Sequence, residues 1–158
     1  MYSLTGDEYI EKVVKLYSKS MLNAAYSLLR SVPDAEDAVQ DVFLKLIEKS
    51  PEFKDANHEK AWLMRVTINI SKNMLKASQR KTLSDYEDIP CRQNNNEVLQ
   101  CVMNLEEKYR TIIHLYYYED YSIKEIASIL NLPRATVGTR LSRGRNLLKT
   151  MLKGDFEL

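Results

Sequence analysis

The sequence predicts an all-α protein: two small helical domains joined by a flexible linker, the C-terminal one a helix-turn-helix. Three observations support this fold class. The 158 residues include only four glycines and four prolines, and long stretches contain neither, which favours helices. Apolar residues recur at intervals of three and four over most of the chain. One stretch, residues 80–96, loses this period and ends in an asparagine run, so we expect it to be the linker.

Three amphipathic helices are expected in the N-terminal domain, residues 1–79. Their apolar spacing places them over residues 7–31, 34–49 and 58–79. Thr5 and Glu8 have the spacing of a capping box at the start of the first helix. The second helix begins with acidic residues, which the helix dipole favours in a first turn. Trp62 on the third helix is expected in the core.

The C-terminal domain, residues 97–158, is expected to hold three or four shorter helices, over residues 97–118, 122–130 and 134–152. Ser122 and Glu125 have capping-box spacing. Asn131 tolerates the left-handed conformation that ends a helix sharply, and Pro133 fits the start of the next helix. A short helix, a three-residue turn and a second helix with inward-facing Val137 and Leu141 predict a helix-turn-helix.

Charge is unevenly distributed, although the formal net charge is only +1. Residues 34–59 hold eight acids and three lysines, whereas residues 60–84 and residues 134–153 each hold six bases and no acid. A block of one sign is most often a solvated face. Two basic blocks on separate helical units nevertheless indicate a polyanion that contacts both.

The second helix of the helix-turn-helix carries the side chains that would contact DNA. Those suited to phosphates are Arg140, Arg143, Arg145 and Lys149. Those near enough to its front to reach base edges are Arg134, Thr136, Thr139 and Ser142. Gly138 either permits a close backbone approach or is simply tolerated. The alternative is a helical hairpin whose arginines keep it soluble, but a solvated face usually mixes charge signs.

Catalysis is not expected. His58 and His114 lack a nucleophile or carboxylate constellation, and no phosphate-binding glycine loop or metal-ligand spacing is present. Cys91 and Cys101 fit buried or idle thiols in a reducing cytoplasm. No apolar run approaches the length of a membrane span. We therefore expect a cytoplasmic, non-enzymatic protein without a cofactor, a metal or membrane insertion.

Both halves resemble conserved regions of the extracytoplasmic-function sigma factors, the small two-domain members of the bacterial sigma-70 family. The stretch "YRTIIHLYYYEDYSIKEIASILNLPRATVGTRLSRGRNLL" is similar to the fourth conserved region, and "DAEDAVQDVFLKL" with "AWLMRVTINISKN" is similar to the second. The resemblance implies a subunit that binds core RNA polymerase and directs promoter-specific initiation. Its N-terminal domain would recognise and melt the minus-ten element, and its C-terminal domain would read the minus-thirty-five element.

The resemblance also implies roles for individual residues. Docking on the clamp helices of the largest polymerase subunit would involve Asp37, Gln40, Asp41, Phe43 and Leu44. The minus-ten element would be faced by Asn69, Lys72, Asn73, Lys76 and Arg80. The loop over residues 50–60, with Asn57 and His58, would hold an unstacked base, although ordinary caps of a surface loop explain these two equally well. Further implied partners are the flap of the second-largest subunit and an anti-sigma factor.

Three positions depart from the family pattern, because similar proteins often have Asp at Asn73, Arg at Lys76 and a longer side chain at Gly138. These departures concern base-specific contacts more than the general activity. Two other classes compete with the sigma factor. A dimeric repressor or activator would not need the second basic block after Trp62, and an anti-sigma-type or scaffold protein would not need a helix-turn-helix.

Overall fold

A computed structural model describes residues 6–81 and 97–156 of the chain. Within these two ranges it consists of helices and contains no strand, which confirms the all-α prediction. The chain divides into two compact units, residues 1–74 and residues 75–158. We call them the N-terminal unit and the C-terminal unit.

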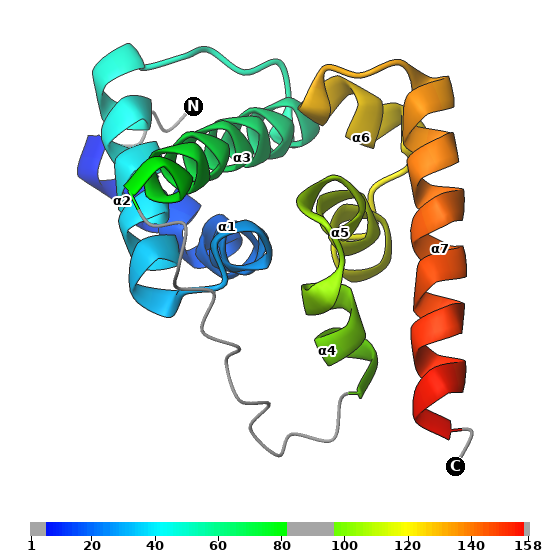
Figure 1. Ribbon diagram of the computed structural model, residues 1–158. Coiled ribbons are helices and arrows are strands. Elements are labelled where there is room, and N and C mark those ends of the chain that lie inside the picture. The colour runs from blue at the N-terminus through cyan, green and yellow to red at the C-terminus, as the bar shows by residue number, and fades with distance from the viewer. Residues whose placement is uncertain (1–5, 82–96, 157–158) are drawn as a thin grey trace. The chain divides into compact units, whose positions relative to one another are not determined.

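The N-terminal unit is built from α1 (Gly6–Leu29), α2 (Val32–Lys49) and most of α3 (Ala56–Lys81), coloured blue to green in Figure 1. Each helix turns one apolar stripe inward, as the spacing of its apolar residues requires. The resulting core combines side chains from all three helices: Val13, Met21, Ala25, Ala35, Ala38, Val39, Val42, Leu46, Leu63 and Ile70. The alanines of α1 and α2 are small and buried, so these two helices approach closely.

The turn between α1 and α2 is tighter than the apolar pattern indicated. Arg30 is left-handed, with φ 57°, so α1 ends at Leu29, two residues before the predicted end. The Ser31 side chain accepts a hydrogen bond from the Asp34 amide at 3.3 Å and caps α2. Helix α2 therefore begins at Val32 and includes Pro33, because a first helical turn needs no amide donor.

Helix α3 also differs from its predicted bounds at both ends. It begins at Ala56, where Asp55 Oδ1 accepts a hydrogen bond from the His58 amide at 2.7 Å. It continues through Lys81, so the first two residues of the predicted linker are helical. The remaining linker positions, 82–96, and the Thr5 member of the predicted capping box lie outside the described residues.

The C-terminal unit contains α4 (Glu97–Asn104), α5 (Glu107–Ile113), a π-helical turn η1 (His114–Tyr118), α6 (Ile123–Leu130) and α7 (Arg134–Phe156). In Figure 1, α7 is the long orange to red helix, and it packs against α4, α5 and α6. The stretch that was expected to be helical, residues 97–118, therefore forms three separate elements: α4, α5 and η1. Its core side chains include Val102, Leu105, Ile112, Ile113, Leu115, Ile126, Ile129, Val137 and Leu141.

The π-helical turn buries the second histidine of the sequence. The Glu119 amide bonds the His114 carbonyl oxygen at 3.2 Å, five residues back, which widens the turn. His114 is buried, its Nε2 lies 3.4 Å from Glu119 Oε1, and its ring stacks on Tyr118 at a centroid distance of 5.5 Å. This histidine is therefore packed inside the C-terminal unit.

A side-chain hydrogen bond from Tyr9 links α1 to the start of α3. The Tyr9 hydroxyl donates to Glu59 Oε2 at 2.6 Å. Burial, and then the neighbouring Glu59 carboxylate, raise the pKa of Tyr9 above its ordinary value. The folded state therefore favours the protonated phenol. Its contribution to stability is complete below the unfolded pKa of about 10 and declines as the pH rises beyond it.

Tyr9→Phe should lower the free energy of unfolding by about 1 kcal/mol at neutral pH, because it removes one hydrogen bond to a charged acceptor. It should also reduce the loss of stability above pH ~10. Urea unfolding of both proteins between pH 7 and 11 measures this, with Tyr26→Phe as the matched control at another partly buried tyrosine. Parallel pH profiles for Tyr9→Phe and the parent chain would contradict the assignment.

Candidate nucleic-acid interface

The helix-turn-helix is assembled as its local signals predict. The Ser122 side chain accepts from the Glu125 amide, and the Glu125 side chain accepts from the Ser122 amide, both at 3.1 Å, which confirms the capping box. Asn131 ends α6 in the left-handed conformation, with φ 55° and ψ 50°. The Pro133 carbonyl then accepts the first bond of α7, from the Val137 amide at 3.1 Å. These contacts fix where the second helix starts.

One face of α7 is committed to packing. Val137, Leu141 and Gly144 are buried, at helical spacing on a single stripe. The remaining circumference therefore faces away from the other helices of this unit. Thr139 and Ser142 are exposed near the middle of that outer surface, where base edges in a groove would be closest.

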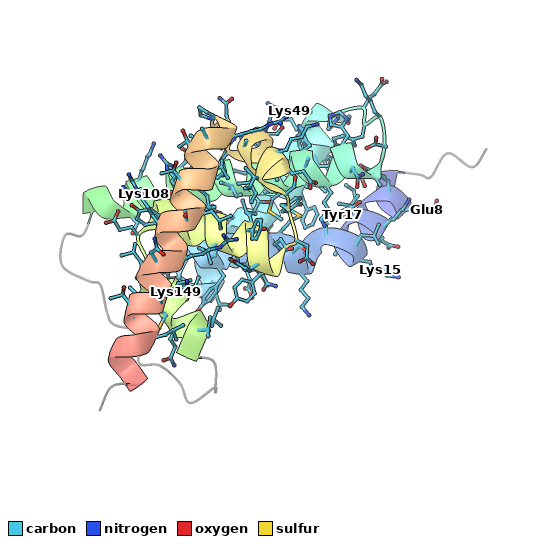
Figure 2. All side chains as sticks on the ribbon, turned by 90° about the vertical axis from the view of Figure 1, so that its right-hand side faces the viewer. Glu8, Lys15, Tyr17, Lys49, Lys108 and Lys149 are labelled. Atoms are coloured by element: carbon cyan, nitrogen blue, oxygen red, sulfur yellow. The ribbon has the colours of Figure 1, made fainter. Side chains whose placement is uncertain are left out.

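The predicted cations of α7 lie on two flanks of this outer surface. Because successive helix residues are offset by about 100°, Arg140 and Arg145 are about 140° apart around the axis. Arg134 and Lys149 share the flank of Arg145, and Lys149 is labelled in Figure 2. Thr136 and Arg143 share the flank of Arg140. A flat surface could not contact both flanks, whereas the two backbones that line a DNA groove can.

Gly138 and Gly144 of α7 have different roles. A Cβ at Gly144 would lie 3.1 Å from Ile113 Cγ1 and 3.3 Å from Ile113 Cδ1, so this glycine allows α7 to approach α5 closely. A Cβ at Gly138 would meet no heavy atom within 4 Å. The fold therefore does not require glycine at position 138.

Arg145 is already engaged by aromatic side chains. Its Nε donates a hydrogen bond to the Tyr117 hydroxyl. Its guanidinium carbon lies 5.4 Å from the Tyr116 ring centroid and 5.5 Å from that of Tyr117. Tyr117 and Tyr118 remain 49% and 41% exposed. No local sequence pattern predicts this contact, because its partners are 28 residues apart.

The outer face of α3 brings together the residues predicted for the minus-ten element. Asn69, Asn73 and Lys76 are exposed and Lys72 is partly buried, all on one stripe. Arg80 continues the spacing, but its side chain lies outside the described part. Arg65 is exposed on the same stripe and was not singled out. Its position four residues before Asn69, on the same side of a helix, was the sequence signal that could have identified it.

Trp62 lies at the start of this stripe and contributes to the core, as expected, but only in part. It is partly buried and packs against the core cluster, so it is not a fully enclosed core residue. Trp62 is only partly buried because of its position around the helix. It lies in line with the exposed Arg65 and Asn69 and beside the buried Leu63. Phe53, from the loop before α3, meets the Trp62 ring edge-on at a centroid distance of 5.7 Å.

The loop before α3 is held by His58. Its Nδ1 accepts a hydrogen bond from the Lys54 amide at 3.1 Å, and its ring meets Phe53 edge-on at 5.4 Å. A ring nitrogen that accepts from an amide carries no proton, so the other nitrogen, Nε2, is the donor of the neutral ring. His58 and Asn57 are exposed in the first turn of α3. His58 thus orders this loop and leaves one donor toward solvent.

A second exposed face, on α2, brings together most of the predicted docking residues. Asp37, Gln40, Asp41 and Leu44 are all exposed on one stripe. Ile47, 57% exposed, and Glu48 extend it and were not predicted, although they continue the same spacing. Phe43 points away from this stripe, because it is partly buried against the core cluster. The face combines an apolar centre with acidic neighbours.

Over the described ranges, no group of three or more histidine, cysteine or acidic side chains could hold a metal ion. In the same ranges, no helix has the length and apolar character needed to cross a membrane.

Comparison with known families matches two separate parts of the chain. Residues 13–81, within α1 to α3, match the family described as Sigma-70 region 2. Residues 95–148, which include α4 to α6 and most of α7, match Sigma-70, region 4.

Individual proteins resemble the chain over most of its length. It is 28% identical to the ECF RNA polymerase sigma factor SigW of Bacillus subtilis, over 89% of this chain and 87% of that protein. It is 25% identical to the RNA polymerase sigma-H factor of Pseudomonas aeruginosa, over 89% of this chain and 84% of that protein.

Two solved structures share the fold. The sigma factor RpoE from Bartonella quintana, crystallised with the anti-sigma factor NepR, has a TM-score of 0.75 at 22% identity, covering 92% of this chain and 97% of that one. CnrH in complex with the cytosolic domain of CnrY has a TM-score of 0.72 at 22% identity, covering 95% of this chain and 91% of that one.

The glycines of α7 generate a paired prediction. Gly138→Ala should raise the free energy of unfolding by up to about 1 kcal/mol, because alanine favours a helix and meets no neighbour. Gly144→Val should lower it by about 1–3 kcal/mol through crowding against Ile113. Thermal unfolding of the two variants and the parent chain measures both. Equal effects at the two positions would contradict the close approach at Gly144.

Proposed function

The chain belongs to the extracytoplasmic-function sigma factors of the sigma-70 family, and from this membership we propose how its surfaces divide the work of promoter-specific initiation by RNA polymerase. The outer surface of α7 reads the minus-thirty-five element. The stripe on α3 recognises the minus-ten element and helps to open it. The exposed face of α2 docks on the clamp helices of the largest polymerase subunit.

The outer surface of α7 between Arg134 and Lys149, which holds no acidic residue, is the single observation that carries this proposal furthest. A helix-turn-helix places its second helix in the major groove. Arg140 and Arg143 on one flank, and Arg134, Arg145 and Lys149 on the other, suit the two backbones beside that groove. Thr139 and Ser142 between the flanks are short hydroxyl side chains that suit base edges. The surface thus combines positioning and readout.

The α3 stripe supports contact with a strand that has left the duplex. Binding of a single strand combines cations that follow the backbone with aromatic or polar groups that receive bases. Arg65, Lys72 and Lys76 supply the cations, and Asn69 and Asn73 supply amide donors and acceptors. The loop before α3, held by the exposed His58, supports a pocket for one unstacked base.

The α2 face supports docking on a basic protein surface. Leu44 is 59% exposed and Ile47 57% exposed on a well-formed helix, which leaves apolar area without a partner inside this unit. Asp37 and Asp41 flank this area, and an acidic rim attracts and orients a partner of opposite charge.

Three further assignments follow from the family. We propose that the C-terminal unit also binds the flap of the second-largest subunit, and that the protein acts in the cytoplasm with its polymerase. Among the solved structures with this fold, the sigma factor RpoE is in complex with the anti-sigma factor NepR, and CnrH is in complex with the cytosolic domain of CnrY. An anti-sigma factor is therefore the restraining partner that we propose for this chain.

Transcription in vitro tests the proposal as a whole. Purified core polymerase is combined with a genomic library, with and without this chain, and start sites are mapped. Start sites that require the chain are the expected result, and their upstream sequences give the promoter. Repression of existing starts, with none gained, would favour the dimeric repressor and contradict the proposal.

Asp41→Ala should weaken assembly with core polymerase by about fivefold, because it removes one of the charges that face a basic partner. The start sites chosen by the enzyme that does assemble should stay the same. Titration of labelled chain with core measures the first effect, and start-site mapping measures the second. Glu11→Ala removes one exposed carboxylate from α1 and is the control. Equal affinity for Asp41→Ala and the parent chain would refute the docking assignment.

Arg140→Ala should weaken binding of the assembled enzyme to its promoter by about tenfold and reduce the slope of log affinity against log salt by about 0.9, the value for one phosphate contact. Lys12→Ala removes an exposed cation from α1 and should change neither quantity. Fluorescence anisotropy with promoter DNA at several salt concentrations gives both. An unchanged slope with Arg140→Ala would remove this residue from the interface.

A further inference from the structure

An exposed cation of α7 is held in place before any ligand arrives. The Arg145 guanidinium stacks beside Tyr116 and Tyr117 and donates from Nε to the Tyr117 hydroxyl. The two rings support each other edge-on, with centroids 4.9 Å apart. We call this arrangement the tyrosine clamp. It joins η1 to α7 outside the apolar core.

The clamp orients one part of the guanidinium and leaves the rest available. Arginine has five N–H donors, and Nε supplies one of them. The two terminal nitrogens keep the fork that binds phosphate with two parallel hydrogen bonds. A free arginine would lose side-chain entropy when it bound a phosphate, whereas a clamped one has lost much of it already.

The clamp has little effect on the core. Tyr117 is 49% exposed and Arg145 is exposed, so their contact buries little apolar area. Exposed cation–aromatic pairs contribute only about 0.5–1 kcal/mol. Its consequence is therefore local: the wider π-helical turn presents two neighbouring tyrosines to one arginine of the helix-turn-helix.

We propose that Tyr116 and Tyr117 are positioning residues that hold Arg145 ready for one backbone phosphate of the minus-thirty-five DNA. This inference rests on the proposed function. It adds that the Arg145 side chain, on one flank of α7, is held in position before DNA binds. Arg143, on the opposite flank, has no such clamp and serves as the comparison. The clamped contact fixes the register of α7 on the duplex.

A double-mutant cycle tests the proposal in the full chain assembled with core polymerase. The variants are Arg145→Ala, Tyr117→Phe and the pair. Arg145→Ala should lower promoter affinity about tenfold and reduce the salt slope by about 0.9. Tyr117→Phe keeps the ring and loses the hydrogen bond, so it should lower affinity about threefold. In the Arg145→Ala background Tyr117→Phe should have no further effect.

The matched control is Arg143→Ala, combined with Tyr117→Phe in the same way. Arg143 has the same charge and lies on α7, so the two effects should simply multiply. A threefold loss from Tyr117→Phe that persists in the Arg145→Ala background would overturn the proposal. So would a Tyr117→Phe variant with the affinity and salt slope of the parent chain. Weaker assembly with core at unchanged promoter affinity would instead assign Arg145 to a protein carboxylate, and would also overturn it.

A measurement on the free chain separates this inference from the proposed function. The Arg145 Nε–H resonance is assigned by its absence in Arg145→Lys. Its chemical shift should differ from that of a free arginine, and its exchange with water should be slow. Tyr117→Phe should abolish both properties. Free-arginine behaviour in the parent chain would overturn the clamp even if promoter binding is normal. A clamped resonance in a chain whose polymerase complex shows no promoter binding would instead refute the proposed function, and the DNA role of the clamp with it.

Discussion

Burial of one apolar stripe of α7 determines what the C-terminal unit presents to a partner. Val137 and Leu141 turn inward, and Gly144 allows the helix backbone to approach Ile113. Rotation of α7 about its axis would expose these side chains, at about 1.5–3 kcal/mol for each large apolar group. The stripe therefore holds the acid-free flanks outward, so the packing that stabilises this unit also orients its contacts with DNA.

The N-terminal unit follows the same logic with two outward faces. The buried alanines of α2 face the core, which leaves Asp41, Leu44 and their neighbours on the opposite side. On α3, Arg65, Asn69 and Asn73 are likewise exposed on one stripe. An acidic and apolar face on one helix and a basic and amide-rich face on another suit two different partners. A protein that joins a polymerase to DNA requires that division.

Local signals in the sequence predicted the parts that depend on neighbouring residues. The capping box at Ser122, the left-handed Asn131 and the three-residue turn each involve a few consecutive positions, and each is confirmed. The half-buried Trp62 and the breaks near Asn104 and His114 were not predicted, because apolar spacing alone does not determine how far a helix continues. The tyrosine clamp depends on a widened turn and on a contact between distant residues, and neither has a sequence signal.

Hydroxyl-radical footprinting tests the central claim, that outward faces fixed by helix packing contact two promoter elements only when polymerase holds both units. Our account predicts two separate protected segments with the assembled enzyme, the upstream one on both strands beside a single major groove. Neither segment should be protected by the chain alone at the same concentration. A single, twofold-symmetric footprint from the chain without polymerase would contradict the account.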